Sequence, residues 1–306
     1  MNQKSGKLYL IGAFSLAGTS VISARFVTGK LGTFTITAVS LAFALLFLVP
    51  LCRKQLVRYI RKMSYRHFLF LLLQAFCGIF LFRLFLLSGL NHTSAGEAGI
   101  LIGATPTITA LLAMVVLRES VSGKKLAGVL CTVGGILIIQ GVLVPGNRFS
   151  MEHIGGNMLV LCAAICESIF NTLSRIFAVK SEAEQKEFSI PIAQTAIVSA
   201  IALLLCMIPS AFEKPLENLL EIGLSGWIAL LWYGVFVTAL AFICWYSGIK
   251  RCTAFTAAAF SGIMPFTSML LSVVILGEDV DYLQWLGGFL VIIGMILIGT
   301  KSNGKF

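Results

Sequence analysis

The sequence GATPTITALLAMVVLRE at residues 103–119 is matched later in the chain by GIMPFTSMLLSVVILGE at residues 262–278. Each copy begins with G-x-x-P, continues with mostly apolar residues and ends with glutamate. The same shift in numbering, without a gap, extends the match to residues 88–137 and 247–296. The chain therefore contains an internal duplication, with one copy in each half.

The composition indicates a membrane protein. Of the 306 residues, 58% are hydrophobic and only 12% are charged, whereas soluble domains carry about 25% charged residues. The charges are segregated, and they leave stretches near the ~20 residues that a helix needs to cross hydrocarbon. We predict ten such spans, at residues 7–27, 33–51, 67–88, 94–117, 125–143, 154–177, 189–209, 223–248, 253–276 and 282–300. Helices are expected because the runs lack the alternation of barrel strands.

The positive charges predict the orientation of the chain. If the amino terminus is cytoplasmic, only Lys30, Arg148 and Lys214 among the 23 lysines and arginines fall in outer loops. Most of the others fall in inner segments, as the positive-inside rule requires. We therefore expect a multi-pass protein of the inner or plasma membrane with both termini cytoplasmic. This distribution explains the net charge of +10 without a nucleic-acid partner.

The duplication predicts an all-α fold of ten transmembrane helices in two inverted five-helix repeats (5+5), at residues 1–148 and 149–306. Each half carries an odd number of spans, so the second copy is upside down in the membrane. Inverted repeats are typical of alternating-access transporters, which bind substrate near the midplane. Glycines seven residues apart follow each copy, and they predict close helix packing.

The residues Gly103, Pro106, Gly262 and Pro265 form a duplicated candidate hinge. A proline inside a helix removes a backbone hydrogen bond and tends to kink the helix. The functional interpretation is a pair of bent or broken helices that flex during transport, and the alternative is a static kink.

These motifs resemble the drug/metabolite transporter superfamily, specifically its ten-helix EamA-type transporters. The resemblance rests on the two G-x-x-P motifs, on Glu119 and Glu278, and on the glycines that follow, and it spans nearly the whole chain. It implies a central cavity lined mainly by helices 1, 3, 4, 6, 8 and 9, with helices 5 and 10 at the periphery. It leaves the substrate open, because members are associated with amino acids, other metabolites, sugar-linked compounds and drugs.

Polar residues inside the spans are the candidate substrate-binding residues. An ionisable side chain at the bilayer centre costs about 2.5–3.5 kcal/mol on insertion scales, so each one suggests a function. Glu167 lies halfway along its span and could bind an ammonium group or a proton. Asn171 follows one turn later on the same face. Arg83 could hold a carboxylate or phosphate through two hydrogen bonds.

Two further charges, Glu97 and Arg175, are candidates for coupling or for ion pairs. The alternative to a substrate site is that Arg83 pairs with Glu97, and Glu167 with Arg175, as structural ion pairs. Among many aromatic residues, Tyr246 and Trp232 are the stronger binding candidates because each also offers a hydrogen-bond donor.

Other activities find no support in the sequence. There is no G-x-x-x-x-G-K-[ST] motif, so no ATP-binding subunit is implied, and the eight cysteines have no metal-ligand spacing. No catalytic residue, cofactor or metal site is expected, and the protein is not expected to be an enzyme. We predict a secondary transporter that exports small metabolites, with amino acids favoured and protons as a candidate coupling ion. The alternative is a multidrug or quaternary-amine exporter.

The sequence of residues 52–66 predicts either an amphipathic helix on lipid headgroups or a solvated basic loop.

Overall fold

The computed structural model describes residues 3–61, 63–105, 107–109, 112, 123–139, 153–183, 191–252, 257 and 260–299. These residues are predominantly helical, and among them β pairing is limited to one isolated bridge between Thr28 and Leu31. Six helices in the described part are long and apolar enough to cross a membrane, and three shorter apolar helices accompany them. The chain is therefore a multi-pass integral membrane protein, and its helices satisfy their own backbone hydrogen bonds.

The first half contains five helical segments with described helices. The first segment is α1 (Gln3–Gly18) with α2 (Ser20–Arg25), and the second is α3 (Thr33–Arg61). The third is continuous through α4 (Tyr65–Ala75), the π-helical turn η1 (Phe76–Leu81) and α5 (Phe82–Leu90). The last two are α6 (Ala95–Ile102) and α8 (Gly123–Ile139).

The second half follows the same order. It begins with α9 (Ile154–Ala183) and α10 (Pro191–Ala211), and the short α11 (Pro215–Glu221) leads into the next segment. That segment runs through α12 (Gly223–Trp232), the π-helical turn η2 (Tyr233–Leu240) and α13 (Ala241–Ile249). The described part ends with α15 (Ile263–Leu276) and α16 (Tyr282–Gly299).

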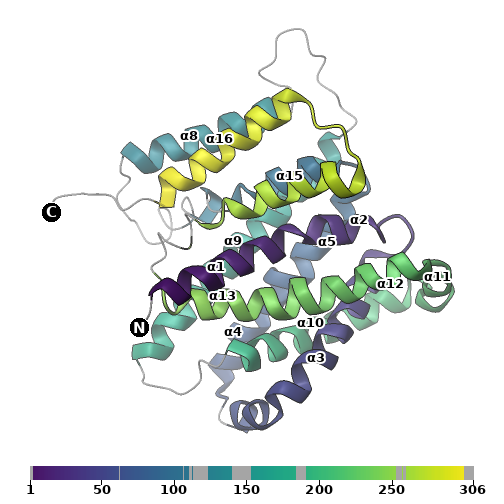
Figure 1. Ribbon diagram of the computed structural model, residues 1–306. Coiled ribbons are helices and arrows are strands. Elements are labelled where there is room, and N and C mark those ends of the chain that lie inside the picture. Colours follow the sequence, from purple (N-terminus) through teal and green to yellow (C-terminus); the bar gives the residue numbers. More distant parts are fainter. Residues whose placement is uncertain are drawn as a thin grey trace.

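Helices of the two halves pack against each other throughout the bundle. The first helix, α1, contacts α13 and α15, while α9 contacts α5 and α6. At one edge, α8 and α16 lie side by side, as Figure 1 shows at the top of the view. The centre of the molecule is therefore built by helices from both halves.

The glycine stripes explain the close contact between α8 and α16. A Cβ atom on Gly135 would lie 2.6 Å from the carbonyl oxygen of Gly287, and one on Gly294 would lie 2.6 Å from that of Gly128. Real Cβ atoms do not come this close to backbone, so the two helices could not approach this far with larger residues. The close packing predicted from the seven-residue spacing is confirmed.

The basic segment after the second span differs from our prediction. We expected the span to end at residue 51 and a separate loop or surface helix to follow, but α3 continues through Pro50 to Arg61. A proline removes one backbone hydrogen bond, and the lysines, arginines and leucines beyond it are good helix formers. Tyr59 near the end of α3 is buried, and its hydroxyl lies 3.3 Å from His67 Nε2 in α4.

Breaks and wide turns occur at positions that the duplication relates. The π turns η1 and η2 end at Leu81 and Leu240, which are equivalent under the shift between the repeats. Turns also interrupt the helix at residues 103–104 and 261–262, next to the two candidate hinge glycines. The same departures from a regular α-helix thus recur in both halves.

Candidate functional site

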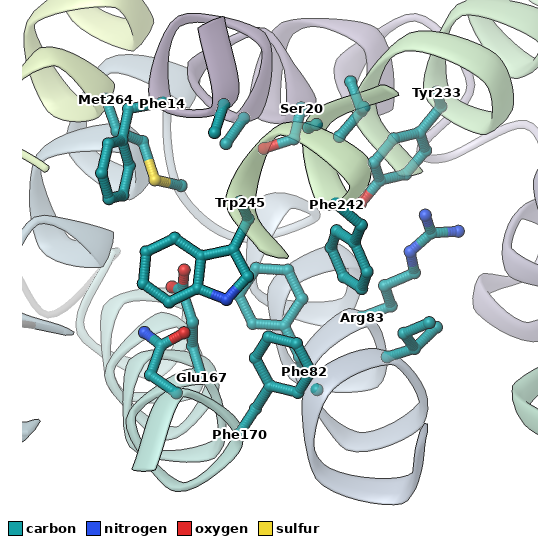
Figure 2. A pocket seen from close by; sticks show the side chains of 17 residues that line it. Phe14, Ser20, Phe82, Arg83, Glu167, Phe170, Tyr233, Phe242, Trp245 and Met264 are labelled. Atoms are coloured by element: carbon teal, nitrogen blue, oxygen red, sulfur yellow. The ribbon is translucent and has the colours of Figure 1, made fainter. Parts of the chain in front are cut away.

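A cavity lies in the centre of the bundle, between helices of both halves. Its empty space, counted together with the part open to solvent, is about 740 Å³, and residues from α1, α2, η1, α5, α9, η2, α13 and α15 line it. Figure 2 shows Arg83 and Glu167 on the wall of this cavity, with aromatic side chains between them.

The duplication supplies matched wall positions with different chemistry. Gly78 and Phe82 line the cavity from the first half, and their equivalents Val237 and Ala241 line it from the second. Arg83 likewise corresponds to Phe242, and both face the cavity. At this pair of related positions, the first half therefore carries a charge and the second half carries an aromatic ring.

Arg83 is buried, with 4% of its surface exposed, and neutral groups hold its guanidinium. It donates to Ser40 Oγ of α3 at 2.6 Å and to Thr238 Oγ1 of η2. Its guanidinium carbon lies 4.1 Å from the centre of the Tyr233 ring, a cation–π contact. No carboxylate among the described residues lies within 4.0 Å of it, so the alternative of an Arg83–Glu97 ion pair is wrong.

Thr238, which lies in the π-helical turn η2, links Arg83 to that turn. The Thr238 hydroxyl donates to the carbonyl oxygen of Tyr233, five residues earlier, at 2.8 Å. The hydrogen bonds of a π-helix also join residues five apart. The η2 turn therefore brings the Thr238 hydroxyl and the Tyr233 ring to the same guanidinium.

Glu167 lies on α9 and contacts the hydroxyl of Thr105. Thr105 Oγ1 is 2.9 Å from Glu167 Oε2 and 2.7 Å from the carbonyl oxygen of Ile102. No lysine, arginine or histidine among the described residues forms an ion pair with Glu167. Asn171, one turn further along α9, also lines the cavity, as predicted from its spacing. The side chain of Arg175 lies outside the described part of the structure, so its proposed pairing stays a prediction.

Six of the residues that line the cavity are aromatic. Phe170 and Phe242 stack with centroids 5.5 Å apart, and Phe14 meets Trp245 edge to face at 5.7 Å. Such pairs exclude water and form an apolar surface for a ligand.

Glu97 lies away from the cavity lining, in a polar cluster at the start of α6. It is 8% exposed and accepts hydrogen bonds from Asn157 Nδ2 at 2.7 Å and from Gln284 Nε2 at 3.1 Å. His153 Nδ1 lies 3.1 Å from Oε1 of Glu97, and the Thr93 hydroxyl donates to Oε2. These contacts join α6, α9 and α16, which indicates a structural link between helices for this carboxylate.

The two aromatic donors singled out from the sequence do not line the cavity. Tyr246 is buried behind it, in edge contact with Phe170, and donates to Gln74 Oε1 at 3.2 Å. Trp232 is 36% exposed, and its indole donates to Thr19 Oγ1 at 2.9 Å.

The neighbouring residues Tyr233 and Trp245 line the cavity instead. They belong to a four-residue series, Tyr233, Val237, Ala241 and Trp245, that lines the cavity. A regular α-helix would not keep this series on one face, so no reliable signal in the sequence pointed to it. Ser40, Thr105 and Thr238 offered no such signal, because isolated hydroxyls are common in membrane helices.

Three of the four candidate hinge residues are described, and Pro106 lies outside the described residues. Gly103 ends α6 and packs against α15, where a Cβ atom on Gly103 would lie 3.1 Å from Pro265 Cβ. Gly262 immediately precedes α15. The glycine of the first G-x-x-P motif therefore packs against the proline of the second, across the two halves.

Glu278 caps a helix of the other half. Its carboxylate accepts hydrogen bonds from the backbone N–H groups of Ala95 at 3.0 Å and Gly96 at 2.9 Å, at the start of α6. A carboxylate at a helix N-terminus satisfies free donors and complements the helix dipole. Its repeat-related residue, Glu119, lies outside the described part.

The sequence pattern of the EamA-like transporter family matches residues 4–141 and 154–300. The chain belongs to the EamA-like transporter family. This confirms the resemblance that the duplicated motifs indicated, and it identifies the protein as a membrane transporter.

Relatives of this EamA-family chain are transporters by name. An uncharacterized transporter, YetK, of Bacillus subtilis (strain 168) is 28% identical over 304 residues, which cover 98% of this chain and 88% of the relative. A probable terminal-alkyne amino-acid exporter of Streptantibioticus cattleyicolor is 24% identical over 228 residues, covering 74% and 72%. One solved crystal structure shares the fold, with a TM-score of 0.64 and 20% identity over 97% of this chain and 96% of that chain.

Proposed function

We propose that this EamA-family protein exports small zwitterionic metabolites, with neutral amino acids as the leading class. The observation that carries the proposal is the presence of Arg83 and Glu167 in one cavity, where neither has an opposite charge among the described residues. A buried charge is costly unless it is paired. A bound α-amino acid supplies a carboxylate for Arg83 and an ammonium group for Glu167, and thereby pairs both.

The architecture that goes with this function is a 5+5 inverted repeat, with halves at residues 1–148 and 149–306. It would lie in the inner or plasma membrane with both termini cytoplasmic, and the halves would rock around the cavity. The matched positions of η1 and η2, and the helix breaks beside Gly103 and Gly262, support this arrangement. The relative named as an amino-acid exporter supports the substrate class and the direction.

We include proton coupling at Glu167 in this proposal, and the hydrogen bonds of Thr105 support it. The threonine hydroxyl has one proton but two close oxygen neighbours, the Ile102 carbonyl and the Glu167 carboxyl group. A carbonyl oxygen can only accept. The Thr105 hydroxyl donates to the ionised Glu167 carboxylate in one arrangement; in the other it donates to Ile102, and a protonated Glu167 can then donate to the Thr105 oxygen. The Glu167 carboxyl group would then bind either a proton or the substrate ammonium group, one after the other, and this exchange would couple the two.

The test is transport by purified protein in liposomes. Vesicles loaded with L-norleucine, a neutral amino acid, are placed in a more acidic medium, and efflux is measured. We expect the inward proton gradient to speed efflux by the wild type and by Trp232→Phe, which changes an aromatic residue outside the cavity. Glu167→Gln keeps the size of the side chain and should abolish the response to the gradient.

The competing assignment is a multidrug or quaternary-amine exporter, in which the aromatic walls and Glu167 bind a lipophilic cation. Tetraethylammonium efflux without norleucine efflux would establish that assignment and refute ours. Unchanged proton-driven efflux in Glu167→Gln would remove Glu167 from the site.

A further inference from the structure

Three neutral hydrogen-bond donors on the cavity wall have no partner among the residues that the structure describes. Six buried side-chain polar atoms in the described part lack a hydrogen bond, and three of these line the cavity: Ser20 Oγ, the Tyr233 hydroxyl and Trp245 Nε1. The two hydroxyl residues are 3% and 1% exposed. An unpaired buried polar group costs free energy, so a cluster of them beside a ligand cavity points to the ligand.

Figure 2 shows how the three donors lie. The oxygens of Ser20 and Tyr233 point toward the open middle of the cavity, whereas the Trp245 indole nitrogen faces away from Ser20, toward the part of the cavity where Glu167 and Phe170 lie. They come from α2, η2 and α13, so the donors belong to three separate elements. The Tyr233 ring also contacts the Arg83 guanidinium, so its hydroxyl adjoins the proposed carboxylate site.

The chemistry of these groups selects a neutral acceptor. The indole N–H can only donate, while the two hydroxyls can donate or accept. Among the described residues, Arg83 and Glu167 are the charged side chains that line the cavity. We propose that Ser20, Tyr233 and Trp245 provide a third, neutral binding subsite, in which at least one of these donors binds an uncharged oxygen acceptor (an ether, carbonyl or hydroxyl oxygen) on the substrate side chain.

This inference rests on the proposed function and narrows its substrate class. Purely aliphatic amino acids would leave the three donors unpaired in the bound state. A site built to hydrogen-bond a substrate discriminates against an analogue that lacks the polar atom, because the polar groups of the site then stay unsatisfied. Amino acids with an acceptor oxygen in the side chain should therefore bind more tightly than aliphatic ones of the same shape.

The experiment compares two ligands of nearly equal shape, L-norleucine and O-methyl-L-homoserine, in which an ether oxygen replaces one methylene group. Dissociation constants are measured on the purified full-length protein by calorimetry. We expect the wild type to bind the ether about fivefold more tightly, which corresponds to one additional net hydrogen bond. Transport by the wild type should show the same order of preference.

Three variants each remove a donor and keep the rest of the side chain or most of it: Trp245→Phe, Tyr233→Phe and Ser20→Ala. At least one should reduce the preference to near unity. The matched control is Trp232→Phe, which removes an indole N–H bonded to Thr19 outside the cavity and should keep the full preference.

The outcomes separate the two proposals. Equal binding of both ligands by the wild type would refute the third subsite and leave the amino-acid function standing. A preference that survives in all three variants would also refute it. Binding of neither amino acid would refute the proposed function and the subsite together.

Discussion

Replacing Arg83 with glutamine should remove substrate binding without unfolding the protein. The guanidinium has neutral partners in Ser40, Thr238 and the Tyr233 ring, so the substitution leaves no carboxylate unpaired. Removal of one member of a buried ion pair costs about 3–5 kcal/mol because the other charge stays buried. Here we expect the loss of two hydrogen bonds from a charged group, about 1.5–3 kcal/mol each, offset in part because a buried charge is no longer desolvated.

The substitution should also weaken substrate binding. A hydrogen bond between charged groups contributes about 1.5–3 kcal/mol, which converts to roughly 10- to 150-fold in affinity. Arg83→Gln should therefore raise the dissociation constant for L-norleucine, and the KM for transport, by about that factor. Arg83→Lys keeps the charge but loses the planar fork, and we expect an intermediate affinity.

The assays are calorimetric binding, norleucine efflux from liposomes and thermal unfolding in detergent. If Arg83→Gln is folded and still has the wild-type affinity and KM for norleucine, the assignment of Arg83 to the substrate carboxylate is refuted. A collapse of the melting temperature in Arg83→Gln, but not in Arg83→Lys, would instead show that the charge is structural. Faster tetraethylammonium efflux in Arg83→Gln would favour the cation exporter.

Three further predictions concern packing, capping and the limits of the site. Gly294→Ala should destabilise the α8–α16 contact by about 1–3 kcal/mol, or very roughly 2–6 °C in melting temperature, whereas Gly134→Ala, with open space beside it, should not lower it. Glu278→Ala should lower the stability by about 1–2 kcal/mol, because α6 loses its cap. The control Glu217→Ala removes an exposed ion pair with Lys214 and should change the stability by less than about 1 kcal/mol. Thermal melts measure both variants, and equal shifts would contradict the capping role. Trp232→Phe should leave norleucine KM unchanged in the efflux assay, and a several-fold rise would place Trp232 in the binding site.

The polar residues show how far reasoning from sequence reaches. Spacing alone put Glu167 and Asn171 on one face of α9, and both line the cavity. The partner of Arg83 could not be found this way, because Ser40 and Thr238 come from segments far away in the chain. Glu97 is near Arg83 in sequence, yet its carboxylate bonds instead to Asn157 and Gln284 from other helices.

The aromatic residues show a second limit. The sequence predicts that several aromatic side chains crowd the helix around residues 232–246, but not which of them face inward. In a regular α-helix, residues four apart drift around the axis because a turn takes 3.6 residues. The wider turn of η2 opposes this drift, so Tyr233 and Trp245 line the same cavity. A local π turn has no recognisable pattern in a single sequence.

The sequence by itself determined that this protein is a helical membrane transporter with a duplicated core. The length of the apolar stretches, the segregation of charges and the internal repeat can all be read along the sequence. In a bilayer, such stretches form spanning helices because their backbone groups must bond to one another. The tertiary structure decided which of the buried polar groups share a cavity. That choice depends on the rotation of each helix about its axis and on contacts between segments distant in the chain, and neither is recorded in local sequence.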